Sequence, residues 1–193
     1  MKLVKPKKFL GQHFLKDLKV AQDIADTVDT FPELPILEVG PGMGVLTQFL
    51  VKKDRLIKVV EVDNKDIVPC CTGMIQKEVA ERIAAGPGSK TYGILSVLIQ
   101  AWYKVEYLFT VSEHVFNPPP KVKSAVIRMT RNETKELGCD EKLFKQVVKT
   151  TFNQRRKTLR NSIKPILGKD CPLTENILFN KRPEQLSVAE FID

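Results

Sequence analysis

The chain has 193 residues, of which 42% are hydrophobic and 28% charged, so it is long enough to bury a real core in one or two domains. No apolar run is long enough to span a bilayer, and the basic N-terminus lacks the apolar stretch of a secretory signal, so we expect a cytoplasmic protein. The four cysteines form no C-x-x-C pair and only two histidines occur, which argues against a zinc site or a disulfide framework.

The positive charge is unevenly distributed. The formal net charge is +8 at pH 7, with a sequence pI near 9.3. Lysines crowd the first eight residues, and a second basic cluster lies near the other end of the chain; the cations we single out are Lys7, Lys8, Arg155, Arg156, Lys157 and Arg160. Two basic clusters on one chain indicate contacts with a polyanion, most simply the phosphates of a nucleic acid.

The first predicted element is a helix that begins after Asp17, a residue suited to cap it. Its apolar residues recur at spacings of one, three and four and define one buried face: Val20, Ala21, Ile24, Ala25 and Val28. Pro32 and Pro35 end this segment.

A strand, a glycine turn, a helix and a second strand follow over residues 36–63. The helix turns Leu46, Phe49 and Leu50 inward, and residues 57–63 form the second strand. This order predicts a βαβ unit, which normally forms a parallel sheet with a right-handed crossover.

The pattern breaks after the second strand. Asp63 runs directly into Asn64, and another apolar strand begins near residue 70 with no helix between them. Consecutive parallel strands need a crossover of about a dozen residues or more. We therefore predict that two strand–helix steps, about 50–60 residues, are missing between Asp63 and Asn64.

Beyond this junction the sequence predicts a strand over 70–75, a helix over 76–83 and a mobile loop over 86–90. Residues 94–101 are predicted to be a long apolar strand, followed by the segment 103–109 and a strand over 126–129. Residues 130–140 form a polar linker. We predict two domains, 1–130 and 131–193, the second a small helical domain whose buried face includes Phe144, Val148 and Phe152.

The strongest local motif is the segment 38–44, Glu-Val-Gly-Pro-Gly-Met-Gly. Gly40, Gly42 and Gly44 permit a tight turn and the close approach of a cofactor to backbone. The pattern is neither the dinucleotide G-x-G-x-x-G nor a P-loop. Glu38 would repel a pyrophosphate but attract a sulfonium or an amino group, which favours S-adenosylmethionine over NAD. The alternative is a plain glycine-rich turn.

Glu61, at the end of the second strand, is spaced from the glycines like an acidic residue that accepts hydrogen bonds from ribose hydroxyls. Asp63 is interpreted equally well as a binding residue or as a solvated carboxylate.

Two further segments have open interpretations. Residues 86–91 resemble a P-loop superficially, but Ser89 stands before Lys90 where a P-loop has glycine, so a surface loop that touches RNA is the better hypothesis. Phe116 precedes three prolines and is suited to stack on an extruded base; the alternative is a core phenylalanine.

Together these segments resemble the KsgA-type ribosomal RNA small-subunit adenine N6,N6-dimethyltransferases, in the family's order and over nearly the whole chain. The matching pieces are residues 9–15 (Phe-Leu-Gly-Gln-His-Phe-Leu), 38–44, 60–63, 76–82, 116–125 and 152–162 (Phe-Asn-Gln-Arg-Arg-Lys-Thr-Leu-Arg-Asn-Ser). The resemblance implies a Rossmann-like α/β class I methyltransferase sheet with a small all-helical C-terminal domain.

The resemblance also implies the roles of individual residues. His13 and Leu15 contact the cofactor S-adenosylmethionine, Gly40 lies beneath its methionine moiety and Glu61 holds its ribose. Phe116 packs on the flipped adenine. The basic helix at residues 155–160 follows ribosomal RNA, with Lys121 and the N-terminal lysines as further candidate contacts.

One departure from the family pattern concerns the chemistry. The family carries an acidic residue after its third strand and an Asn-x-Pro-Tyr/Phe motif after its fourth, and neither occurs here. In the family these acceptors bind the adenine amino group and free its lone pair for in-line attack on the methyl sulfonium. A chain that joins Asp63 covalently to Asn64 is therefore expected to lack methyl transfer.

Three functions stay open at this point. The first is an active dimethyltransferase that acts as a monomer on small-subunit (16S) ribosomal RNA within the pre-30S particle. The second is a non-catalytic RNA-binding ribosome-assembly factor. The third is a 23S ribosomal RNA adenine methyltransferase.

Overall fold

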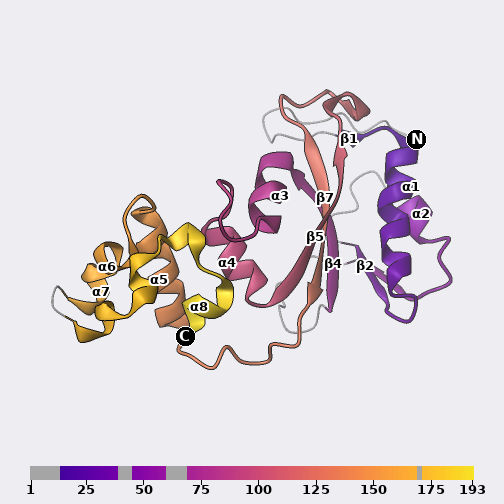
Figure 1. Cartoon of the computed structure of the whole chain (residues 1–193). Coiled ribbons are helices and arrows are strands. Elements are labelled where there is room, and N and C mark those ends of the chain that lie inside the picture. Colours follow the sequence, from indigo (N-terminus) through magenta and orange to yellow (C-terminus); the bar gives the residue numbers. More distant parts are fainter. Residues whose placement is uncertain (1–13, 39–44, 60–68, 169–170) are drawn as a thin grey trace. The chain divides into compact units, whose positions relative to one another are not determined.

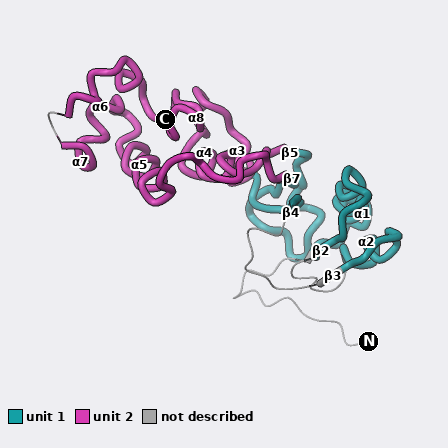
Figure 2. Tube along the Cα trace, turned by 90° about the horizontal axis from the view of Figure 1, so that it is seen from below, with its two compact units in different colours: residues 1–77, 108–128 teal, residues 78–107, 129–193 magenta. Residues whose placement is uncertain are grey.

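The computed structural model describes residues 14–38, 45–59, 69–168 and 171–193 (Figure 1). The chain divides into two compact units, which Figure 2 colours separately: unit 1 comprises residues 1–77 and 108–128, and unit 2 comprises residues 78–107 and 129–193. Among the described residues, no helix is both long enough and apolar enough to cross a membrane.

Unit 1 begins with β1 (Phe14–Leu15), α1 (Leu18–Asp26) and the 3₁₀ helix η2 (Thr27–Thr30). The Asp17 carboxylate caps α1 by accepting hydrogen bonds from the backbone N–H groups of Lys19 (2.9 Å) and Val20 (3.2 Å). The helix buries Ala21, Ile24 and Ala25. The cap and the buried face predicted from the sequence are confirmed.

The predicted βαβ unit is also present. Strands β2 (Ile36–Glu38) and β3 (Ile57–Val59) pair in parallel with Ile36 opposite Ile57, and α2 (Thr47–Leu50) lies between them in the chain. Ala25, Ile36 and Leu50 form the buried cluster that joins α1, α2 and this pair of strands.

A second sheet contains β4 (Cys70–Gln76), β7 (Ser124–Arg131) and β5 (Tyr103–Val111), in the spatial order β4-β7-β5. The 3₁₀ helix η3 (Glu113–Val115) leads into β6 (Phe116–Asn117), which pairs antiparallel with β1. Ile24, Val111, Phe116 and Val126 form the core of this region. In the described parts of the chain, the β2–β3 pair and the β4-β7-β5 sheet are separate sheets.

The prediction of a strand over residues 94–101 is wrong. The segment forms α4 (Ile94–Gln100), which follows α3 (Lys77–Ala84) and the loop of residues 85–93. The Ser96 hydroxyl accepts a hydrogen bond from the Gly93 N–H (3.0 Å) and donates one to the Arg82 carbonyl, which fixes the first turn of the helix. Short apolar runs are ambiguous in periodicity, and here the contact with Arg82, 14 residues earlier, supports the helix.

Helix α4 contributes to the core of unit 2. Tyr92 and Val97 pack with Phe144, Val148 and Phe152 of α5 (Glu141–Asn153). The remaining elements of unit 2 are α6 (Leu159–Ser162), α7 (Lys164–Leu167), η4 (Pro172–Glu175), η5 (Ile177–Asn180), η6 (Pro183–Gln185) and α8 (Val188–Ile192). The buried face predicted for the helical segment is confirmed, and the domain boundary at residues 130/131 stays a prediction.

Candidate functional site

The carboxyl end of β2 places an acidic side chain where a cofactor is predicted to bind. Glu38 is 5% exposed, and its Oε2 atom has no hydrogen-bond partner among the described residues. A buried, unpartnered carboxylate oxygen is costly unless something pairs with it. A positively charged or N–H-bearing ligand is chemically suited to pair with this oxygen.

The structure brings two other predicted site residues together. Leu15 of β1 lies directly opposite Phe116 of β6, and the Lys16 N–H donates to the Val115 carbonyl (2.9 Å) beside this pair. Phe116 is 4% exposed and packs in the core of unit 1. That burial fits the alternative of a core phenylalanine, and stacking on an adenine stays a prediction.

Several predicted site residues lie outside the described residues. They are the cofactor candidates His13, Gly40, Gly42, Gly44 and Glu61, and the RNA candidates Lys7 and Lys8. Their roles stay predictions.

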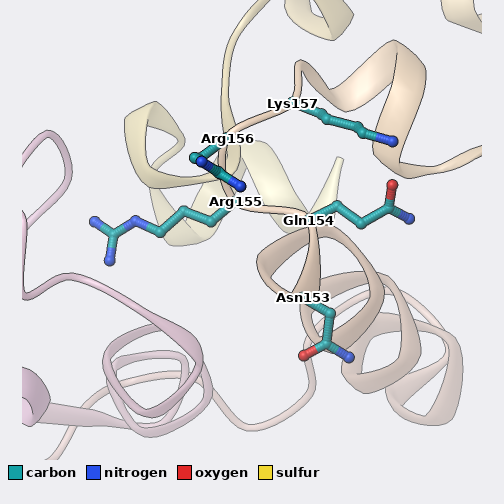
Figure 3. Close-up of a pocket in the computed structure, with 5 residues that line it drawn as sticks. All are labelled: Asn153, Gln154, Arg155, Arg156 and Lys157. Carbon is teal, nitrogen blue, oxygen red and sulfur yellow. The ribbon is translucent and has the colours of Figure 1, made fainter.

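The second basic cluster was expected on a helix over residues 155–160, and this expectation is wrong for residues 155–157, which form the turn that follows α5. Residues Asn153, Gln154, Arg155, Arg156 and Lys157 line an open pocket of about 320 Å³ (Figure 3). Arg156 and Lys157 are exposed, and a pocket lined by amides and cations is suited to an anionic ligand such as a phosphate.

Arg155 differs from its neighbours in this turn. Its Nη2 atom donates to the Ser89 carbonyl (3.1 Å), and its Nε atom lies 3.4 Å from Glu184 Oε2. In Figure 3 its side chain extends away from that of Lys157. Sequence reasoning did not predict that Ser89 and Glu184 contact Arg155, because no local pattern links residues so far apart in the chain.

The other predicted RNA contacts lie on the surface. Lys121 is exposed in the loop before β7, and Arg160 is exposed on α6, where its Nε atom donates to the Thr174 carbonyl (3.0 Å). The structure places Arg156, Lys157 and Arg160 in unit 2 and Lys121 in unit 1.

The chain matches the family model described as Ribosomal RNA adenine dimethylase over residues 4–68 and 70–193. It is 74% identical to "Ribosomal RNA small subunit methyltransferase A" of Bacteroides thetaiotaomicron, in an alignment that covers 100% of this chain and 93% of the relative. It is 46% identical to the protein of the same name in Porphyromonas gingivalis, covering 100% of this chain and 97% of that relative.

Solved structures show the same fold. The model is similar to a dimethyladenosine transferase from Plasmodium falciparum (TM-score 0.72, 20% identity, covering 93% of this chain and 94% of the other). It is also similar to the 23S rRNA methyltransferase ErmE (TM-score 0.63, 20% identity, covering 93% and 98%). The predicted class I methyltransferase fold is therefore confirmed.

The alignment with one relative is longer than the chain itself. The alignment with the Bacteroides thetaiotaomicron relative spans 249 residues, which exceeds the 193 residues of this chain by 56. The family match is interrupted at residue 69, just before β4.

Proposed function

The chain belongs to the ribosomal RNA adenine dimethylase family, and on that premise we propose that it transfers methyl groups from S-adenosylmethionine to N6 of adenine in small-subunit (16S) ribosomal RNA. The product is N6,N6-dimethyladenosine, formed during ribosome biogenesis. The observation that carries this proposal is the family match over residues 4–68 and 70–193. The names of the relatives favour the small-subunit RNA over a 23S substrate.

The cofactor site is proposed to lie at the carboxyl end of β2. S-adenosylmethionine supplies a methyl group on a positively charged sulfur. The buried Glu38 carboxylate fits a cationic ligand of this kind, because its Oε2 atom has no partner among the described residues. Leu15 supplies apolar surface from β1. The glycines at 40, 42 and 44, with His13 and Glu61, complete the proposed set.

Exposed cations are proposed to contact RNA in each unit separately: Arg156, Lys157 and Arg160 in unit 2, and Lys121 in unit 1. Each cation that neutralises a phosphate releases counterions, so binding depends steeply on salt. We further propose that the substrate is RNA within the pre-30S particle and that the protein acts there as a cytoplasmic monomer.

A second candidate function is binding of ribosomal RNA without methyl transfer. It is favoured by the 56 aligned positions that the relative has in excess of this chain. The Asn-x-Pro-Tyr/Phe motif expected of the family is absent from the 193 residues, so the continuous chain lacks the acceptors for the adenine amino group.

Transfer of labelled methyl groups to unmethylated small-subunit particles separates the two functions. The 193-residue chain is compared with a chain that carries the extra segment of the Bacteroides thetaiotaomicron relative between Asp63 and Asn64. Methyl incorporation should rise by about a hundredfold or more when the segment is present, because hydrogen-bond acceptors aimed at the reacting group are restored. Failure of both chains to transfer methyl groups would contradict the first function.

The intact mass of the protein from its natural source gives an independent test. A mass well above 21.9 kDa shows that the protein carries the extra segment and supports methyl transfer. A mass near 21.9 kDa, with salt-dependent RNA binding and no methyl incorporation, supports the second function.

Calorimetry tests the cofactor site directly. Glu38→Gln should weaken the binding of S-adenosylmethionine or its demethylated product by about tenfold to a hundredfold, since a hydrogen bond to a charged group is lost. Glu33→Gln is the matched control, because it makes the same change at an exposed position of the preceding loop. Equal affinities in both variants would remove Glu38 from the cofactor site.

A further inference from the structure

The turn that follows α5 contains two adjacent arginines in different environments. Both arginines line the pocket, but Arg156 is exposed, whereas the Arg155 side chain is 37% exposed and contacts two other segments of unit 2. Its guanidinium donates to the Ser89 carbonyl of the 86–92 loop and lies 3.4 Å from the Glu184 carboxylate of η6. A guanidinium is well suited to this task because its planar fork presents several donors in fixed directions.

Two of these three segments, the loop and η6, are also joined by a backbone hydrogen bond. The Gly88 N–H donates to the Glu184 carbonyl (2.6 Å), so the loop is attached to η6 at a residue next to Ser89. Within the loop, the Ser89 hydroxyl donates to the Gly86 carbonyl (3.1 Å) and accepts from the Tyr92 N–H (3.1 Å). The loop is therefore attached to η6 at Gly88 and braced internally by Ser89, and its mobility stays a prediction.

The Glu184 carboxylate needs Arg155 to compensate its negative charge. Its Oε2 atom is buried and accepts no hydrogen bond of good geometry within the described structure, and Arg155 is the cation placed beside it. A buried carboxylate that loses its cation is left uncompensated, which is costly. Removal of Arg155 is thus expected to loosen the attachment of the loop as well as the turn.

We propose that Arg155 is a positioning residue for RNA binding and not itself a phosphate contact. With Ser89, Gly88 and Glu184 it forms a clasp that fixes the turn of residues 153–157 against the 86–92 loop. The clasp holds Arg156 and Lys157 in one geometry, so that less conformational entropy is lost when phosphates bind. This inference rests on the RNA-binding part of the proposed function.

Hydrogen exchange of the free 193-residue chain tests the clasp without any RNA. Arg155→Ala should speed exchange of the Gly88 amide by about tenfold or more, because the guanidinium and its charged hydrogen bond are lost. Arg156→Ala is the matched control and should leave that amide unchanged. Unchanged exchange in Arg155→Ala would overturn the proposal.

The salt dependence of binding to a 16S ribosomal RNA transcript separates positioning from contact. Arg156→Ala and Lys157→Ala should each reduce the slope of log affinity against log salt by about 0.7–0.9, the value for one phosphate contact. Arg155→Ala should weaken binding severalfold and keep the slope of the unaltered chain. A slope reduced as much as in Arg156→Ala would overturn the proposal.

Two conservative variants distinguish the loss of these contacts from a general loss of folding. Arg155→Lys keeps the charge but not the fork, and it should loosen Gly88 as the alanine variant does. Glu184→Gln keeps the shape of the partner and should loosen it as well. Normal Gly88 exchange in both would overturn the clasp. If the unaltered chain showed no salt-dependent RNA binding, the proposed function would fail, while the exchange measurements would still decide the clasp.

Discussion

The two compact units differ in how their cores are built. Unit 2 surrounds one buried cluster in which α4, α5 and α8 share Tyr92, Val97, Phe152 and Phe191. In the described part of unit 1, buried residues gather in two clusters, one around Ile36 and one around Val126, and Leu46 packs against both. No described strand joins the β2–β3 pair to the β4-β7-β5 sheet by hydrogen bonds.

The difference coincides with the interruption of the family match at residue 69, between the last described residue of β3 and the start of β4. A sheet buries apolar surface best when its strands are continuous, whereas a helical cluster of side chains can close on itself. The predicted position of the missing segment lies in unit 1, so we expect its absence to weaken unit 1 and to leave the core of unit 2 intact. The following predictions test this comparison.

The largest expected effect is on unit 2. Phe152 is 8% exposed and its ring lies 6.0 Å from Tyr92 and 5.8 Å from Phe191, measured between centroids. Phe152→Ala should lower the free energy of unfolding by about 3–5 kcal/mol. Trp102, the one tryptophan of the chain, belongs to unit 2 and reports its unfolding by fluorescence.

Leu143→Ala on the same helix is the control for this variant, because Leu143 is 49% exposed. It should change the free energy of unfolding by about 0.5 kcal/mol or less. A small effect of Phe152→Ala on the Trp102 signal would show that the cluster of unit 2 is not its stabilising core.

Unfolding in urea should separate the two units. Far-UV circular dichroism, which reports both units, should begin to change at a urea concentration lower by on the order of 1 M than the Trp102 fluorescence. Insertion of the relative's extra segment between Asp63 and Asn64 should bring the two curves together. If the circular dichroism and fluorescence curves of the 193-residue chain coincided, the expectation that unit 1 is the weaker unit would be refuted.

A smaller effect concerns the attachment of α8. Glu190 accepts from the Ser187 N–H (2.8 Å) and pairs with Lys181 Nζ (2.5 Å). The hydrogen bond from Lys181 and those from Ser187 lower the pKa of Glu190 from 4.5 to about 2. At neutral pH, Glu190→Ala should reduce the free energy of unfolding by about 1 kcal/mol.

The sign of the pH dependence follows from the lowered pKa. The folded state binds the proton of Glu190 less tightly than the unfolded state, so this stabilisation is complete above pH 4.5. It is lost as the pH falls toward 2, and the difference between Glu190→Ala and the unaltered chain should disappear there. Glu136→Ala, at an exposed position, is the control. A difference that grew on acidification would contradict this assignment.

The smallest expected effect is that of Tyr92→Phe. The Tyr92 ring is fully buried, and its hydroxyl has no hydrogen-bond partner among the described residues. Burial, with a smaller contribution from the charge of Glu190, raises the pKa of Tyr92 to about 12. Removal of the hydroxyl should leave the free energy of unfolding unchanged or raise it by about 1 kcal/mol. A clear loss of stability in thermal melts would mean that the hydroxyl has a partner.

The sequence by itself determined the elements that depend on local chemistry. Asp17 capped α1 as predicted, because a cap is formed by a side chain and the amides two and three residues later. The glycine motif and the order of the matched segments identified the family. The break after Asp63 was predicted because parallel strands need a long crossover, and its position stays a prediction.

Tertiary structure alone decided what depends on distant partners. The apolar run at 94–100 became a helix because Ser96 bonds the Arg82 carbonyl and Val97 packs against α5. Arg155 and Arg156 are adjacent residues of the same type, yet in the described structure it is Arg155 that contacts Ser89 and Glu184. Which arginine is held by the protein and which stays exposed follows from the folding of segments 29 and 66 residues away, and no local pattern encodes it.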